Sequence, residues 1–314
     1  MTRRGPASAA RWLTVVLVVA VGVALAGCTP GLPDTAHGAD RIDTSPSPIP
    51  GGSRSEAHRS RDSFPSAADT GPDGPLAPYD GPLVVRTDGT VIENVEIVAP
   101  QVLVAANDVT FRNVRFVYSG EIDAEYAMVA VDPRVRGTTF EDCEIDGRNG
   151  TARAISGAGG VTVKSCNIHD VGNGVEVQSD LTVEDSWIHN IRTRAGTEWH
   201  ADGIQTRDHD VQNVRIVNNT ILLDGDETAA VNIMVKSGRP KNIVVSDNLV
   251  GGGSYTLSVD AAEPADGFAV QSNYFTTESF PNVGRWGAWY PRGRNIEAGG
   301  NRVLETAAEL EPAR

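Results

Sequence analysis

The chain has 314 residues and a formal net charge of −14, with only three lysines, Lys164, Lys236 and Lys241. Nucleic-acid binding needs clustered Lys and Arg, so we expect no nucleic-acid partner. An acidic surface also repels polyanionic glycans, although salt screens this repulsion over about 8 Å. A site for uronates would therefore need a local basic patch.

Residues 1–27 have the pattern of an export signal. Arg3, Arg4 and Arg11 precede an apolar run over residues 12–26, which is short for a membrane span and wrongly flanked. The run ends in Leu25-Ala26-Gly27-Cys28, which resembles a bacterial lipobox. The resemblance implies that Cys28 is acylated and that the exported protein is anchored to the cell membrane by lipid. The alternative is an ordinary signal peptide followed by an incidental cysteine.

Residues 28–80 are rich in Pro, Ser, Gly, Asp and Ala and contain almost no aromatic or β-branched clusters. Such a composition cannot bury enough apolar surface to offset the entropy of ordering. We therefore expect a disordered tether, followed by one folded domain over residues 81–314.

An eight-residue phrase recurs along this domain, as in Val214-Arg-Ile-Val-Asn-Asn-Thr-Ile221. Its first, third and eighth positions are apolar, which is strand alternation interrupted by a corner. Clear copies begin at residues 109, 138, 161, 181, 214, 243 and 268, so the period is 20 to 33 residues. This period predicts an all-β solenoid of about eight to nine stacked coils.

The sixth position of the phrase becomes asparagine in the last four coils. The column reads Val95, Val114, Cys143, Cys166, Ser186, Asn219, Asn248, Asn273, Asn301. Asparagine tolerates the left-handed conformation that we expect at such a corner, and stacked amides can satisfy buried polar groups. The pattern resembles the right-handed parallel β-helix of the pectin-lyase-like superfamily over residues 82–303.

Cys143 and Cys166 occupy the same corner position on adjacent coils, where strands lie about 4.8 Å apart. That separation suits a disulfide, and an exported protein can form one. The alternative is a pair of stacked buried thiols, because free cysteine is a common core residue.

A third strand precedes the phrase in the central coils, at residues 174–178, 203–207, 232–236 and 256–260. If the first residues of these four strands are aligned, the first, third and fifth positions point outward. They predict three exterior rows, namely Gly174/Gly203/Asn232/Thr256, Glu176/Gln205/Met234/Ser258 and Gln178/Arg207/Lys236/Asp260. In pectin-lyase-like proteins this face usually forms the carbohydrate groove, which is what the resemblance implies for this chain.

Arg207 and Lys236 would then be neighbours on successive coils. The resemblance implies β-elimination on a uronate polymer, with Arg207 neutralising the carboxylate and Lys236 removing the adjacent proton. A nearby cation lowers the pKa of a lysine toward that of a usable base. Asp260 opposes this role, because it could pair with Lys236 and make the row a surface ion-pair ladder worth about 0–1 kcal/mol.

The segment from Trp199 to Gln205 contains His200 and Asp202 at the start of a groove strand. These residues could act as acid or base, bind a metal or orient a sugar hydroxyl. The structural alternative is that Asp202, which precedes Gly203, caps a turn.

The segment from Arg285 to Arg294 combines aromatic and basic residues between the last two coils. Aromatic rings stack on sugars, so it is a candidate wall of a binding cleft. The alternative is a loop that seals the open end of the solenoid.

Taken together, these residues predict an exported, lipid-anchored, monomeric protein that binds and could cleave an extracellular polysaccharide or cell-wall glycan. The competing hypothesis is a non-catalytic glycan-binding or cell-envelope scaffold module. A hydrolase is less supported, and the signatures of polygalacturonases are absent. We expect no required cofactor and no metal site, with calcium the one possible ion. The candidate catalytic residues are Lys236, Arg207, His200 and Asp202, and the candidate substrate-binding residues are Gln205, Asn232, Asp260, Glu176, Trp286, Trp289, Tyr290 and Arg285.

Overall fold

The computed structural model describes residues 59–310, apart from 123, 198 and 226. These residues belong to the second of the chain's two compact units, Ser55–Arg314. The predicted export signal, Cys28 and most of the predicted tether therefore lie outside the described residues.

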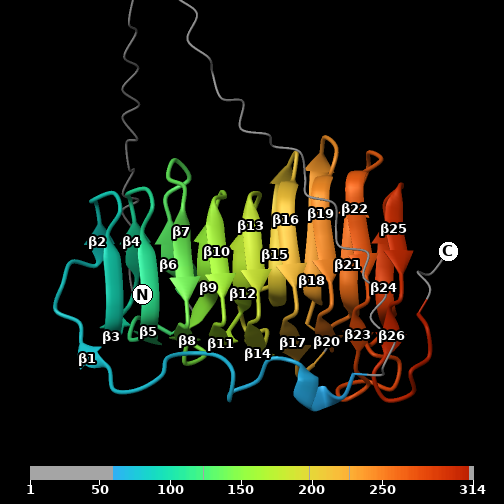
Figure 1. Ribbon diagram of the computed structural model, residues 1–314, viewed down its shortest axis with the longest axis horizontal. Coiled ribbons are helices and arrows are strands. Elements are labelled where there is room, and N and C mark those ends of the chain that lie inside the picture. The colour runs from blue at the N-terminus through green and yellow to red at the C-terminus, as the bar shows by residue number, and fades with distance from the viewer. Residues whose placement is uncertain (1–58, 123, 198, 226, 311–314) are drawn as a thin grey trace, which may run out of the picture. The chain divides into compact units, whose positions relative to one another are not determined.

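The described chain winds into nine stacked coils built from two parallel sheets (Figure 1). One sheet, which we call sheet B, has one strand from each coil. Its strands are β2 (Val84–Val85), β4 (Val102–Val104), β6 (Ala124–Val131), β9 (Thr151–Gly157), β12 (Asn173–Val177), β15 (Asp202–His209), β18 (Ala229–Ser237), β21 (Tyr255–Ala261) and β24 (Gly287–Arg292).

The other sheet, sheet A, has 17 strands, because most coils contribute two strands separated by the predicted corner. They are β1 (Ala77–Pro78), β3 (Val91–Ala99), β5 (Thr110–Tyr118), β7 (Thr138–Glu141), β8 (Glu144–Asp146), β10 (Val161–Lys164), β11 (Asn167–Val171), β13 (Leu181–Glu184), β14 (Trp187–Ile191), β16 (Gln212–Val217), β17 (Thr220–Leu223), β19 (Lys241–Ser246), β20 (Leu249–Gly251), β22 (Asp266–Gln271), β23 (Tyr274–Phe275), β25 (Ile296–Gly299) and β26 (Arg302–Val303). The predicted all-β solenoid is confirmed.

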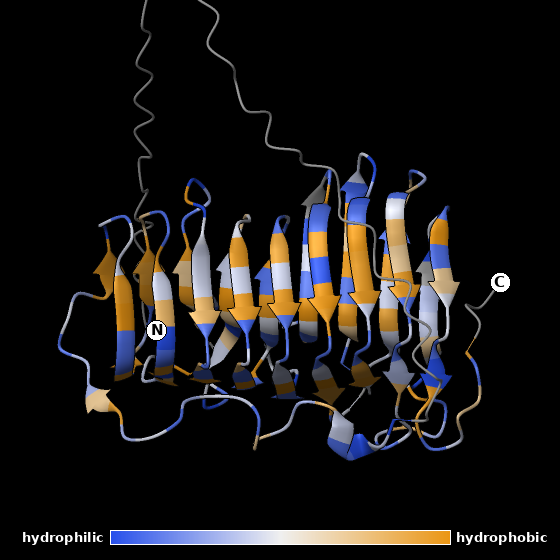
Figure 2. Cartoon of the chain, in the orientation of Figure 1, coloured by the Kyte–Doolittle hydropathy of each residue, from blue (hydrophilic) through white to orange (hydrophobic). Residues whose placement is uncertain are grey.

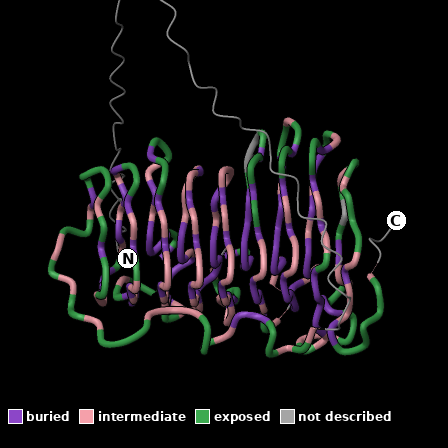
Figure 3. Tube along the Cα trace, viewed as in Figure 1, coloured by how far each residue is buried: buried purple, intermediate pink, exposed green. Residues whose placement is uncertain are grey.

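The core is a set of columns that run from coil to coil. The first position of the phrase, for example, stacks Leu181, Val214, Ile243 and Phe268 in register, and each side chain is at most 1% exposed. Apolar and polar bands alternate along the strands in Figure 2, and Figure 3 shows the matching alternation of burial. Each fully buried side chain of this size contributes about 1.5–3 kcal/mol, so the repeated phrase is the main source of stability.

The predicted asparagine ladder is present at the corner of sheet A. The Nδ2 atom of Asn219 donates to Oδ1 of Asn248 at 3.0 Å, and Asn248 and Asn273 continue the chain of bonds, at 2.9 Å each, to Asn301. Each Oδ1 also accepts a backbone N–H, as Asn248 Oδ1 does from Asn219 at 2.9 Å. The ladder therefore satisfies polar groups that are sealed from water.

The left-handed conformation expected at the asparagine of this corner is found one residue earlier. The left-handed backbone belongs to the fifth position of the phrase, for example Asn218 (φ 54°) and Asp247 (φ 58°), and not to the buried asparagines. The fifth residue makes the turn, and the sixth then points inward to hydrogen-bond between coils.

The predicted disulfide between Cys143 and Cys166 is wrong. Both cysteines are free and fully buried in the corner column. The Cys166 thiol lies 3.2 Å from the carbonyl of Lys164, and burial raises its pKa well above the usual range. The alternative of two stacked core thiols is the arrangement observed.

Residues 59–80 form an ordered strap and not the tether expected there. It begins with the short 3-10 helix η1 (Arg61–Ser63), runs along the outside of sheet A, and ends at β1, which pairs with β3 (Figure 1). Arg59 donates to Oδ1 of Asn218 at 3.0 Å and stacks on Phe64, which is only 2% exposed. The boundary of the folded domain is thus at least 22 residues earlier than position 81.

Candidate functional site

The outward face of sheet B has a different register from the one expected. Asn232 on β18 pairs with Gln205 on β15, and Met234 pairs with Arg207, so β18 is shifted by two residues. A shift of two preserves the alternation of inward and outward side chains, which is why the sequence pattern could not detect it. The observed rows are Glu176/Gln205/Asn232/Ser258/Tyr290 and Arg207/Met234/Asp260/Arg292.

Lys236 therefore does not lie opposite Arg207. Asp208 pairs with Val235 and His209 with Ser237, so Lys236 is the unpaired, exposed residue at an irregularity between β15 and β18. Asp260 pairs instead with Arg292 on the next coil, at 3.6 Å. The expected adjacent pair of cations is wrong, and so is the expected contact between Asp260 and Lys236.

A hydrogen-bonded polar cluster lies at the other end of this face. The Glu176 carboxylate accepts from Nε of Arg153 at 2.5 Å and from Nδ2 of Asn173 at 2.9 Å. Gln205 then donates to Oδ2 of Asp202 at 2.7 Å. The bond from Arg153 links β9 to β12, whereas the other two lie within β12 and within β15 and orient Glu176 and Gln205.

Asp202 is fully buried and does not flank an open groove as expected. Burial raises the pKa of its carboxyl well above the usual range, and the neighbouring Asn232 side chain opposes this shift without overcoming it. The Oδ1 atoms of Asp202 and Asn232 both lack a hydrogen-bond partner. Burial therefore favours the neutral form of this carboxyl, whose O–H would supply a donor where these acceptors have none.

A cleft of about 460 Å³ opens beside this cluster. The loop between β14 and β15 lines it with Trp199 and His200, and the segment between β23 and β24 lines it with Trp286. The lining also includes Glu227, Tyr255 and Ser258. Three further hydroxyl residues complete it, namely Thr193, Thr228 and Ser254.

Backbone hydrogen bonds fix the wall that carries Trp286. Its N–H donates to the carbonyl of Ser254 at 2.9 Å, and the N–H of Arg285 donates to Gly253 at 2.9 Å. The indole ring packs edge-on against Tyr255, with centroids 5.8 Å apart, yet remains 64% exposed. An exposed, anchored aromatic ring is a typical contact of a binding site.

The sequence model of a family described as "Right handed beta helix region" matches residues 83–275, which is more than half of the chain. The chain belongs to this family. The coils are therefore those of a right-handed β-helix. No curated protein and no solved structure matches it. Within residues 59–310, where described, no helix is long and apolar enough to cross a membrane.

The β-helix brings several predicted site residues to the cleft and separates others. Trp286 and His200 line it, and Tyr290 packs against Tyr255 with ring centroids 5.1 Å apart. Arg285 is exposed but is not a lining residue. Trp289 is only 5% exposed and packs in the core of the last coil, so its predicted place at a substrate is wrong.

Tyr255, Ser258 and Glu227 line the cleft, but sequence reasoning did not place them there. Ser258 belongs to a predicted exterior row, and Tyr255 directly precedes that predicted strand at residues 256–260, so both lie beside the expected groove although neither was a predicted site residue. Glu227 is in a turn without repeat periodicity, and the sequence gives no signal for it.

Arg207 belongs to a second, smaller hollow on sheet B. This hollow has a volume of about 270 Å³ and is also lined by Glu176 and Gln178. It contains one basic and one acidic side chain, so its charges balance and it is not the basic patch that a uronate site requires.

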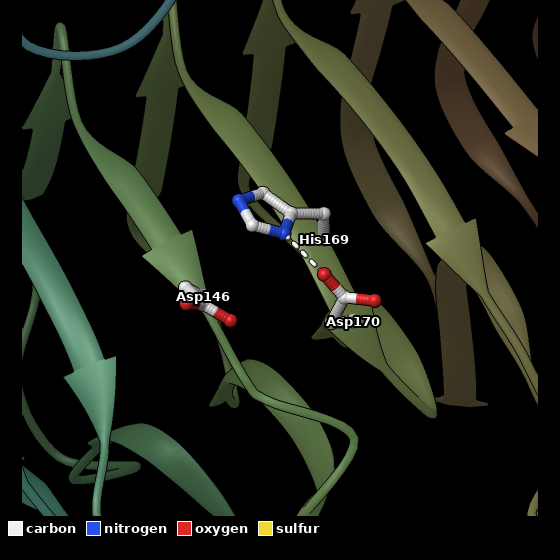
Figure 4. A group of neighbouring side chains, drawn as sticks. All are labelled: Asp146, His169 and Asp170. Carbon is white, nitrogen blue, oxygen red and sulfur yellow. Dashed lines mark hydrogen bonds and ion pairs between the residues drawn. The ribbon is translucent and has the colours of Figure 1, made fainter.

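A third group of ionisable residues lies on two neighbouring strands of sheet A, β8 and β11 (Figure 4). His169 places Nδ1 2.7 Å from Asp170 and Nε2 3.3 Å from Glu144, and it pairs in register with Asp146. Burial opposes the charged ring, but the two carboxylates outweigh it and raise the pKa of His169.

Atoms of Asp146, His169 and Asp170 lie within 4.8 Å of one another, as metal ligands would. Calcium prefers an all-oxygen set, so this group fits it poorly, and both imidazole nitrogens already contact carboxylates. Contacts of the two imidazole nitrogens with Asp170 and Glu144 account for the geometry.

Proposed function

We propose that this right-handed β-helix is an exported, lipid-anchored glycan-binding module, and that its binding site is the cleft between Trp199, Tyr255 and Trp286. Support for export and anchoring comes from the sequence pattern around Cys28. The observation that carries the binding proposal is the exposed indole of Trp286, which is anchored over Tyr255 at the edge of a 460 Å³ cleft.

The lining has the composition of a carbohydrate site. Flat aromatic rings cover the apolar faces of sugar rings, while the hydroxyl groups of Ser258 and its Ser and Thr neighbours can hydrogen-bond sugar hydroxyls. The likeness to pectin-lyase-like proteins, which bind carbohydrate along the same strand face, agrees with this placement.

Catalysis by β-elimination receives less support than binding. The mechanism needs a lysine base beside a cation, and Lys236 is the unpaired residue at the strand irregularity while Arg207 lies opposite Met234. Asp202, the other candidate acid or base, is sealed from solvent. Binding without turnover is therefore the function that the geometry supports best.

The test measures glycan binding by calorimetry. It uses the full chain carrying Cys28→Ser and a panel of neutral, amino and uronate oligosaccharides. Trp286→Ala should weaken binding at least about tenfold, as loss of a central aromatic contact does. Ile122→Ala is the control, because Ile122 is 66% exposed, much like Trp286, but lies outside the cleft. Equal affinity of wild type and Trp286→Ala would contradict the proposal, and release of unsaturated products would show a lyase instead.

A further inference from the structure

We infer that the glycan bound in this cleft carries basic amino groups, as in glucosamine-type units. This inference rests on the proposed function, and it concerns the class of sugar. It starts from the charge of the lining, which contains Glu227 and neither Lys nor Arg among its described residues.

Among the described residues that line the cleft, no Lys or Arg accompanies Glu227. The Oε2 atom of its carboxylate is buried without a hydrogen-bond partner, and Gly225 lies close against it. The turn of Glu227 is held in place, because its backbone carbonyl accepts from Ser254 at 2.6 Å. The cleft therefore contains a carboxylate on an anchored backbone, with one of its two oxygens buried.

Two of the basic residues near the cleft pair with acidic residues outside its lining. Arg192 precedes the lining loop and pairs with Asp224 at 3.0 Å, and Arg292 at the end of β24 pairs with Asp260 at 3.6 Å. Neither is a lining residue. Among the described lining residues, an incoming cation would thus meet the carboxylate of Glu227, whereas an incoming anion would meet no Lys or Arg.

The aromatic rings favour the same ligand. The faces of Trp and Tyr attract ammonium groups, by about 0.5–1 kcal/mol at exposed sites and more when the cation is desolvated. Trp286 and Tyr255 supply such faces beside Glu227. A carboxylate together with aromatic rings recognises an amine, and the same carboxylate repels a uronate.

The experiment compares three oligosaccharides of equal length by calorimetry with the full chain carrying Cys28→Ser. These are a β-1,4-glucosamine oligomer, its fully N-acetylated form and a galacturonate oligomer. We expect the glucosamine oligomer to bind at least about tenfold more tightly than the other two, and its affinity alone to fall as salt is added.

Two matched variants separate the cleft from the overall acidity of the chain. Glu227→Gln should reduce the affinity for the glucosamine oligomer about tenfold and leave the acetylated oligomer unaffected. Glu263→Gln removes the same charge from an exposed position outside the cleft and should change neither. Trp286→Ala should weaken both, and the thermal midpoint of each variant checks its folding.

The results distinguish the two proposals. Preference for galacturonate, or equal affinity for the amino and acetylated oligomers with no salt dependence, would overturn the inference about amines and leave glycan binding intact. Loss of glucosamine binding that is equal in Glu227→Gln and Glu263→Gln would also overturn it, because binding would then follow net charge. Failure of every oligosaccharide to bind would overturn the proposed function itself.

Discussion

Arg207 lies opposite Met234 on the neighbouring strand of sheet B, and not opposite Lys236. The two cations that would form a lyase centre thus do not face each other, and Lys236 is the unpaired residue at a strand irregularity. We expect Lys236→Ala to leave glycan affinity within about twofold of wild type, because Lys236 is outside the lining of the cleft. Calorimetry checks this, and a loss as large as that of Trp286→Ala would place Lys236 in the site after all.

The asparagine ladder should be a major local source of stability. Asn248→Ala removes the bonds to Asn219, Asn273 and the carbonyl of Ile216, and it leaves buried groups unpaired. Each unsatisfied group costs about 1–3 kcal/mol, so we expect a loss of roughly 3 kcal/mol or more in the free energy of unfolding. Denaturant titration measures it. Asn282→Ala, at an exposed loop position, should cost less than about 0.5 kcal/mol.

Thiol labelling tests the state of the two core cysteines. In protein carrying Cys28→Ser, Cys143 and Cys166 should not react with a thiol reagent while folded, since both are fully buried. After unfolding without reductant, two thiols per chain should react. Two reactive thiols that appear only after reduction would reveal a disulfide.

His169 and His189 should titrate on opposite sides of the usual histidine range. Their rings stack with centroids 5.1 Å apart. Burial, and then the charge of His169, lower the pKa of His189 to about 4, whereas the carboxylates raise that of His169. NMR titration measures both values, and His169→Gln should raise the pKa of His189.

The two shifts have opposite signs for stability. The raised pKa of His169 contributes stability that is present below about pH 6.5 and is lost as pH rises through its folded value. The lowered pKa of His189 contributes stability that is present above about pH 6.5 and is lost as pH falls toward 4. A pKa of His189 that does not change in His169→Gln would refute the coupling.

Asp202 should make the protein less stable as pH rises. Its raised pKa means that the folded state keeps a proton that the unfolded chain loses above about pH 4. Asn is neutral at every pH, so the thermal midpoint of Asp202→Asn minus that of wild type should increase from pH 4 to pH 8. Each 1 kcal/mol of unfolding free energy that wild type loses over this range corresponds to roughly 2–4 °C. Asp266→Asn, at an exposed position, should show no such trend.

The sequence predicted the solenoid because its signals repeat. The column that ends in Asn219, Asn248, Asn273 and Asn301 occupies one position of every phrase, so each copy supports the others. The register of β18 was missed because Asn232 and Met234 both point outward, and alternation cannot distinguish them. Glu227 was missed because it lies between coils, where the phrase imposes no pattern.

The strap over residues 59–80 changes how the solenoid should come apart. A stack of repeats is held mainly by contacts between neighbours, so its end coils can fray independently. Here one segment contacts Tyr274 near one end through Phe64, and pairs with Val95 near the other through Ala77. Losing a terminal coil also means releasing part of this segment, which couples the two ends and makes unfolding more cooperative.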